Sequence, residues 1–300
     1  MPDTLFSTMK FITHSCNVET LQGFEVYRLA NEEVSVKVVP ELGAKIISFK
    51  NLRSGREWLW HPSGGLKLFT NQAGDDFSKS PLIGIDECLP TIAPCSWRGR
   101  SLPDHGEAWS AKWSVNREAW QNGILKTSLQ LGISPLRFER AIELAGNEIC
   151  LKYQLHNLSA QNESFLWAMH PLLKLEPEDQ LELPASTRDL LNGATWVDAI
   201  NSAVPPNRCE KIFARPITEG SAGIHNRASG DRLDFIWDAA EIDSLGLWLT
   251  RGGWHDHHHF AIEPANGDAD ALPVAARRNR CGKVAAFSWI EWQLLLRISS

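Results

Sequence analysis

Alternation of apolar and polar residues with a period of two runs through most of this chain, and it restricts the fold more than any other feature. Residues 24–29, 34–39 and 45–50 alternate in this way and are separated by turns that contain glycine, proline or asparagine. This period gives each segment one apolar face, as in a half-buried β-strand, and few segments show the 3.6-residue period of a helix. Many short strands joined by turns are typical of a β-sandwich or a β-barrel.

The same pattern continues to the end of the chain. Further strands are predicted over residues 57–60, 112–120, 125–131, 136–144, 148–156, 232–237, 244–250, 257–262 and 284–298. The turn at Gly146-Asn147 joins two of these strands as a hairpin. We therefore predict an all-β protein, built as a large antiparallel β-sandwich with few short helices. No shift in composition divides the chain, so a single domain over residues 1–300 is expected.

Charge and cysteine content narrow the class of partner. The net charge of −6 disfavours nucleic acid, because phosphate binding needs a basic surface. No apolar run approaches the roughly 18 residues of a membrane span, and the first residues lack the pattern of a signal peptide. The six cysteines form no C-x-x-C pair. This spacing favours free buried thiols and a cytoplasmic location.

Residues 61–104 lack a regular period. Glycine and proline recur there, and acidic pairs occur at Asp75-Asp76 and Asp86-Glu87. Long irregular segments inside a compact domain are functional or disordered, and the apolar residues in this one favour order. We predict that the segment forms a wall of a binding site. Residues 176–230 are also predicted to be rich in loops, because prolines recur along them.

A histidine ends the apolar segment 165–171 (FLWAMHP). The segment is predicted to be one buried strand that Pro171 terminates. Leu166, Ala168 and His170 would share one face of it. That face offers room for a small molecule and then a residue that can carry a proton near neutral pH. His170 is therefore a candidate catalytic residue, and a hydrogen-bonded corner is the structural alternative.

A second group of histidines lies nearer the C-terminus. In an unbroken strand, His255, His257, His259 and Glu263 would share one face. Glu263 could then act as a general base and His170 as the acid on the same substrate. The histidines and a carboxylate could instead bind zinc or another divalent ion, or they could form a solvated turn. The pattern alone leaves these three interpretations open.

Tryptophan is abundant, with thirteen residues against two tyrosines. An indole ring can cover the apolar face of a pyranose, which makes sugar stacking one interpretation. For any single tryptophan, core packing and strand propensity are the favoured explanation.

Four segments, in this order, make the chain resemble the aldose 1-epimerase (galactose mutarotase-like) family. They are residues 39–48 (VPELGAKIIS) with 55–59 (GREWL), 103–107 (PDHGE), 165–171 (FLWAMHP) and 262–264 (IEP). The resemblance extends over nearly the whole chain. It implies a galactose mutarotase-like supersandwich with its site in a concave face. It also implies interconversion of the α and β anomers of an aldose, without a cofactor or a metal.

The resemblance further implies roles for three residues. Glu263 would take the proton of the C1 hydroxyl, and His170 would protonate the ring oxygen. The ring would open, the C1–C2 bond would rotate, and closure would give the other anomer. His105 would bind near the ring oxygen and support the developing charge.

Substrate-binding positions follow from the same comparison. Asp104 and Glu107 flank His105 in its motif and are expected to contact the sugar. Galactose-specific members carry an arginine before this motif and an aspartate between the second histidine and the glutamate. Arg98 lies close to the corresponding loop and is the candidate arginine, and Asp234 and Asp238 are candidates for the aspartate, with no motif to choose between them.

The implied partner is a small-molecule sugar, bound by a monomer or a homodimer. Two other functions are compatible with the sequence. A non-catalytic carbohydrate-binding module on the same scaffold is one, since residues 83–91 contain no arginine and fold does not fix function. A metal-dependent enzyme that uses the histidines of 255–259 is the other.

Overall fold

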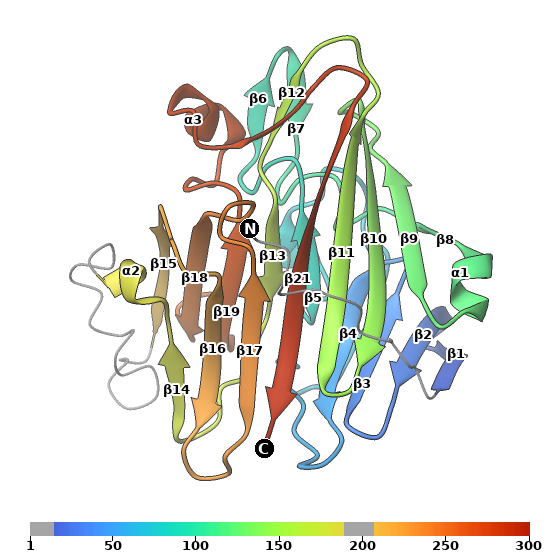
Figure 1. The fold of residues 1–300 in the computed structure, drawn as a ribbon, viewed down its shortest axis with the longest axis vertical. Helices are drawn as coiled ribbons and strands as arrows, with labels where there is room; N and C mark the ends of the chain where they lie inside the picture. Colours follow the sequence, from blue (N-terminus) through green and yellow to red (C-terminus); the bar gives the residue numbers. More distant parts are fainter. Residues whose placement is uncertain (1–14, 189–206) are drawn as a thin grey trace, which may run out of the picture.

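Two large antiparallel sheets face each other in the computed structural model, which describes residues 15–188 and 207–300. Figure 1 shows the sheets as two layers, one behind the other, with the hairpin of residues 95–102 and helix α3 (Leu272–Arg277) beyond one end of the strands. The predicted large antiparallel β-sandwich with few short helices is confirmed.

The first sheet has nine strands. In spatial order they are β1 (Ser15–Leu21), β2 (Phe24–Ala30), β3 (Val34–Val39), β4 (Lys45–Asn51), β5 (Ile85–Cys88), β13 (Ala168–Pro171), β19 (His258–Ala265), β18 (Ser244–Arg251) and β15 (Arg208–Ala214).

The second sheet has eight strands. In spatial order they are β14 (Asp179–Glu182), β16 (Ser221–Asn226), β17 (Arg232–Trp237), β21 (Trp289–Ser299), β11 (Glu148–Asn157), β10 (Leu136–Ala145), β9 (Leu125–Gln130) and β8 (Ser114–Val115).

The remaining elements are short. Two small sheets pair β6 (Cys95–Trp97) with β7 (Arg100–Leu102) and β12 (Glu163–Phe165) with β20 (Gly282–Val284). The helices are the 3₁₀ turn η1 (Phe77–Lys79), α1 (Arg117–Gln121), α2 (Ala185–Arg188) and α3 (Leu272–Arg277).

The apolar faces of the two large sheets share one core. Met169 and Ile262 from the nine-stranded sheet and Tyr153 from the eight-stranded sheet are fully buried in the same cluster. Each such side chain contributes about 1.5–3 kcal/mol when it leaves water. Successive residues of a strand point to opposite faces. His170 follows Met169 and Glu263 follows Ile262, so both lie on the outer face of the nine-stranded sheet. The core thus determines which residues reach a site on that face.

A charged pair bridges the two sheets inside this core. Nη1 of Arg140, on β10, lies 2.8 Å from Oε1 of Glu87, on β5, and both side chains are completely buried. Glu87 also accepts hydrogen bonds from Tyr153 Oη at 3.0 Å and Trp167 Nε1 at 2.8 Å. Arg140 donates a further bond to the carbonyl of Ala44. The pair therefore has specific partners on both sides and fixes the two sheets relative to each other.

The expected strand over residues 112–120 is wrong for most of its length. Only Ser114–Val115 pair as β8, and residues 117–121 form helix α1. The side chain of Asn116 accepts a hydrogen bond from the backbone of Ala119 at 2.9 Å. This N-cap stabilises the helix start and outweighs the strand propensity of the segment.

The segment 165–171 is two strands instead of one. β12 ends at Phe165 and β13 begins at Ala168, and between them the backbone of Trp167 donates to Asn266 Oδ1 at 2.7 Å. The expected common face therefore reduces to Ala168 and His170. Three strands, β14, β15 and β16, lie in the region 176–230 that was expected to be loop-rich, whereas residues 57–60 contribute only isolated bridges.

All six cysteines are free thiols, of which Cys88 and Cys150 are buried and the other four are half-buried. In the described ranges, no helix is both long and apolar enough to cross a membrane.

Candidate functional site

A cavity of about 390 Å³ opens on the outer face of the nine-stranded sheet. Its lining is rich in histidine, aromatic and acidic side chains. They include His105, His170, His255, His259, Phe77, Trp248, Trp254, Asp76, Asp104 and Asp270, together with Lys211. The expected wall from residues 61–104 is present, since Asp76, Phe77 and Ser78 at η1 line one side.

His170 and Glu263 meet below this cavity. They come from β13 and β19, which are adjacent strands, and His170 Nε2 lies 3.7 Å from Glu263 Oε1. Across the next strand, Gly246 is the register partner of Glu263. A Cβ at Gly246 would lie 2.9 Å from Glu263 Oε2, so a side chain at this position would displace the carboxylate. The lack of a side chain at Gly246 leaves room for Glu263 to lie over β18.

His170 is uncharged in the free protein. Its side chain is 8% exposed, and Nδ1 has no hydrogen-bond partner in the structure. Burial holds the pKa of His170 well below its ordinary value, and the nearby His105 and Lys211 lower it further. A buried imidazole with one free nitrogen beside a cavity can exchange a proton with a bound molecule.

Glu263 is held by a lysine that sequence analysis did not identify. Lys211 Nζ lies 3.1 Å from Glu263 Oε2 and 3.0 Å from Asp270 Oδ1. Burial alone would disfavour the charge of Lys211, but the two carboxylates outweigh it and hold the pKa of Lys211 above its ordinary value. Glu263 itself is completely buried, and the two cavity-lining residues that contact it are His170 and Lys211.

His105 is held beside His170 by Phe77 and Asp104. Its backbone has a φ of 57°, and its ring stacks on Phe77 with centroids 3.9 Å apart. Asp104 Oδ1 lies 2.9 Å from His105 Nδ1, and Asp104 Oδ2 accepts from the backbone of Phe77. Burial opposes ionisation of Asp104, yet the His105 contact prevails and lowers the pKa of Asp104. The His105 and His170 rings are 5.2 Å apart, so both can contact one small molecule.

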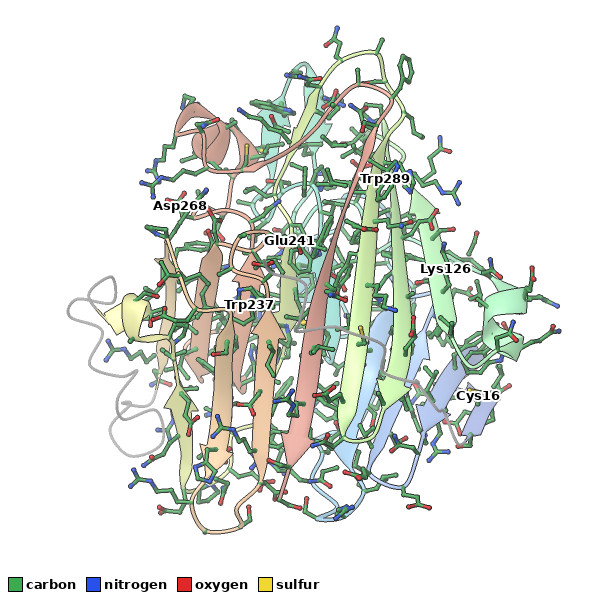
Figure 2. The ribbon with its side chains drawn as sticks, viewed as in Figure 1. Cys16, Lys126, Trp237, Glu241, Asp268 and Trp289 are labelled. Carbon is green, nitrogen blue, oxygen red and sulfur yellow. The ribbon has the colours of Figure 1, made fainter. Side chains whose placement is uncertain are left out.

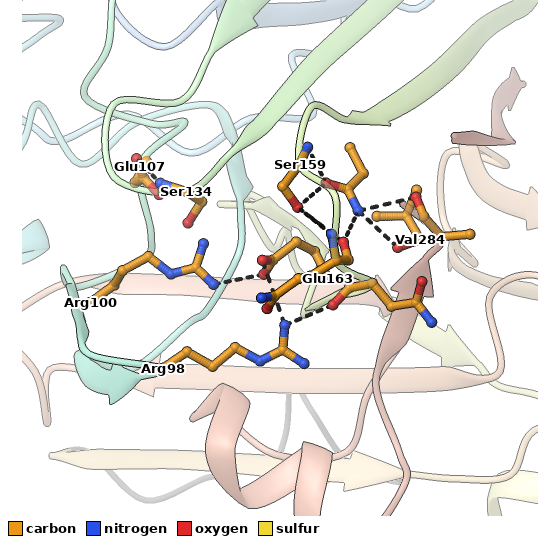
Figure 3. Close-up of polar contacts among 11 residues, drawn as sticks. Arg98, Arg100, Glu107, Ser134, Ser159, Glu163 and Val284 are labelled. Carbon is orange, nitrogen blue, oxygen red and sulfur yellow. Dashed lines mark hydrogen bonds and ion pairs between the residues drawn. The ribbon is translucent and has the colours of Figure 1, made fainter. Parts of the chain in front are cut away.

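Two expected substrate-binding residues near the first motif lie away from this cavity and support the structure instead. Arg98 donates to the carbonyl of Asn162 at 2.7 Å and lies 3.6 Å from Glu163. Glu107 accepts from the backbone amides of Ile133 and Ser134 at 2.6 and 3.1 Å. Figure 3 shows Arg98 directed at Glu163 and Glu107 turned towards Ser134.

The expected aspartates on the other sheet are also outside the cavity. Asp238 follows β17 and accepts from the backbone of Ala240 at 2.8 Å, which closes a turn. Asp234 pairs with Arg232 on the same strand. Asp234 lies on a strand of the eight-stranded sheet and Asp238 directly follows that strand, whereas the cavity opens on the nine-stranded sheet.

The histidine run divides between a turn and a strand. His255 has a φ of 51° in a turn, and β19 begins only at His258. The expected common face therefore joins His259 and Glu263 but not His255. Across residues 15–188 and 207–300, no group of three or more His, Cys, Asp or Glu side chains is arranged to hold a metal ion.

His259 predicts a measurable pH dependence of stability. It is 1% exposed, and both ring nitrogens lack partners. Burial, aided by His257 and His258, lowers its pKa to about 3. In the unfolded chain, His259 binds a proton near pH 6.5, whereas in the folded chain it does so only near pH 3. Acidification between these two values therefore favours unfolding. The free energy of unfolding is expected to fall by about 1.4 kcal/mol per pH unit over most of this interval.

Replacing His259 with glutamine should remove this contribution. Denaturant unfolding from pH 7 to pH 4 should show a flatter decline of the unfolding free energy in His259→Gln than in the parent. His225→Gln, at a half-exposed histidine on β16, is the matched control and should keep the parental slope. Equal slopes in the parent and His259→Gln would contradict the assignment.

No protein-family model and no curated protein matches this chain. Solved structures do match. A candidate aldose 1-epimerase from Klebsiella pneumoniae is 14% identical, with a TM-score of 0.75 over 94% of this chain and 83% of its own. Another from Escherichia coli K12 is 15% identical, with a TM-score of 0.70 over 92% and 99%.

A galactose mutarotase-like protein from Clostridium acetobutylicum is similar to the same extent. It is 13% identical, with a TM-score of 0.71 over 96% of this chain and 99% of its own. These matches confirm, at the level of the fold, the resemblance to aldose 1-epimerases that the four sequence segments indicated.

Proposed function

We propose that this protein is an isomerase that interconverts the α and β anomers of an aldose by acid–base ring opening and closure, without a cofactor. The observation that supports this most is the 3.7 Å separation of His170 Nε2 and Glu263 Oε1 below the cavity. In a cyclic aldose the C1 hydroxyl oxygen and the ring oxygen are bonded to the same carbon. A base and an acid this close together can address both oxygens of one hemiacetal.

The proposed reaction moves two protons. Glu263 takes the proton of the C1 hydroxyl while His170 gives a proton to the ring oxygen, and the bond from C1 to that oxygen breaks. Rotation about C1–C2 presents the other face of the aldehyde, and both protons return on closure. Positioned proton transfer of this kind contributes about 10²–10⁴-fold to a rate. His105 lies 5.2 Å from His170, ring to ring, where it can orient the sugar.

The reaction requires a protonated His170 before the ring can open. Because its pKa lies well below the ordinary value, His170 must gain a proton before it can act as the acid. Productive binding therefore includes proton uptake, and the exchange rate should rise as the pH is lowered from 8 to 6.

The test is anomer exchange measured by saturation-transfer NMR. Glucose, galactose, mannose, fucose and rhamnose would be assayed at pH 6 and pH 8 with the parent protein, His170→Asn and His156→Asn. His156 lies on β11 of the other sheet and is the control. Exchange that is lost only in His170→Asn is the expected result. Equal exchange in all three proteins, or none on any sugar, would contradict the proposal.

A non-catalytic sugar-binding module is the second candidate, and one observation favours it. Glu263 is completely buried and paired with Lys211, so the base has no surface exposed to the cavity without a shift of its neighbours. Binding of a sugar without any exchange would support this function. Measurable exchange would exclude it.

A further inference from the structure

The charges around the cavity suggest which sugars it accepts. Lys211 is the lining residue with a permanent positive charge, and no other lysine or arginine of ranges 15–188 and 207–300 lines the cavity. Asp76, Asp104 and Asp270 contribute carboxylates. Two of the lining histidines, His170 and His259, have pKa values held low by burial and add no charge near neutral pH. An anionic ligand would therefore meet mostly negative groups.

Lys211 is not available to such a ligand. Its ammonium group lies 3.1 Å from Glu263 and 3.0 Å from Asp270, and its side chain is 18% exposed. Asp270 is the more open partner, with 43% of its side chain exposed. Two carboxylates around one ammonium leave a net negative charge at this end of the cavity.

Asp270 is held in place by its own backbone. Its carbonyl accepts hydrogen bonds from the amides of Ile92 and Ala93 at 2.9 and 2.8 Å, and these two residues also line the cavity. The following residues form α3. The backbone is thus fixed on one side by residues 92–93 and on the other by the helix, which keeps the side chain of Asp270 beside Lys211.

We propose that Asp270 is a specificity residue, which occupies Lys211 and restricts the cavity to uncharged aldoses. The inference rests on the proposed function, because one of its two tests measures anomer exchange. A sugar phosphate or a uronate would bring its own negative charge next to Asp270 and find no free cation to pair with. Unit charges a few ångströms apart at a partly buried site repel strongly enough to lower binding about tenfold or more. Salt reduces this repulsion between exposed groups.

The experiment compares the parent protein with Asp270→Asn and the control Asp268→Asn. Asp268 lies on the same loop and pairs with Arg280 at 2.8 Å, but it does not line the cavity. Figure 2 labels Asp268 beside the loop that leads to α3. Anomer exchange would be measured on glucose, glucose 6-phosphate and glucuronate, at low and high salt. Binding of inorganic phosphate would be followed separately by NMR.

The parent should exchange glucose at least about tenfold faster than either anionic sugar at low salt, measured as kcat/KM. In Asp270→Asn, the kcat/KM for glucose should exceed that for the anionic sugars by a smaller factor. This variant should also bind phosphate, because Lys211 then has one anionic partner fewer. Asp268→Asn should behave like the parent. The inference is overturned if the parent prefers the anionic sugars, or if Asp270→Asn changes neither the ratio nor phosphate binding.

Failure of the two proposals can be told apart. If the parent exchanges no sugar, the proposed function fails, and the phosphate measurement still tests the charge argument. Phosphate binding by Asp270→Asn but not by the parent would then support the role of Asp270. Equal binding, or no binding by either protein, would reject it.

Discussion

Replacement of Glu263 with glutamine is expected to lower the rate of anomer exchange by about 10²–10⁴-fold while the fold remains intact. Glutamine has nearly the same shape as glutamate, so it fills the space above Gly246, and Lys211 keeps Asp270 as its partner. An amide cannot take a proton from the C1 hydroxyl at neutral pH. The loss should therefore be in kcat, with a smaller change in KM, because the groups that contact the rest of the sugar are unchanged.

Glu210→Gln is the matched control for this variant. Glu210 is the neighbour of Lys211 on β15, pairs with Arg208 and does not line the cavity. Thermal unfolding of both variants should stay close to that of the parent, and only Glu263→Gln should lose exchange. If Glu263→Gln retained parental exchange, Glu263 could not be the base, and the binding-module function would gain support.

The strand pattern of the sequence predicted the fold because the sandwich has one buried face on each large sheet. Residues 136–145 and 148–157 pair as the expected hairpin, β10 and β11. The same regularity brought together two residues that are far apart in the chain. His170 and Glu263 sit on β13 and β19, and adjacent strands of one sheet placed their side chains on the same face.

Other site residues could not be predicted in this way. Lys211 lies on β15, the edge strand of the nine-stranded sheet, and most of that strand is only half-buried. An edge strand of this kind has no clear apolar face, and prolines in the surrounding segment favoured a loop. Asp270 and Phe77 reach the cavity from a loop and a 3₁₀ turn. The tertiary structure determines which loop and turn residues reach the cavity, and no spacing in the sequence predicts them.

Replacement of Arg140 with methionine should destabilise the protein by about 3–5 kcal/mol. Arg140 and Glu87 are both completely buried between the sheets, and methionine has a similar length without the charge. Glu87 would keep the hydrogen bonds of Tyr153 and Trp167 but lose the cation that compensates its charge. Denaturant unfolding at pH 8 would measure the loss, with Arg137→Met as the control, since Arg137 pairs with Glu139 at the surface of β10.

The size of the loss should depend on pH in a defined direction. Burial raises the pKa of Glu87, and Arg140 opposes this effect. Without Arg140 the carboxyl group can become neutral by binding a proton, so the folded variant takes up a proton that the unfolded chain releases. Its stability relative to the parent should therefore improve as the pH is lowered from 8 to 5.

The double variant Glu87→Gln/Arg140→Met separates the charge from the packing. With no charge left between the sheets, it should recover most of the stability that Arg140→Met loses, because replacing both members of a buried pair is often neutral. A double variant as unstable as Arg140→Met would show that the guanidinium contacts with Ala44 and Trp113, rather than charge compensation, hold the sheets together. A pH-independent loss in Arg140→Met would lead to the same conclusion, since an uncompensated carboxylate must titrate.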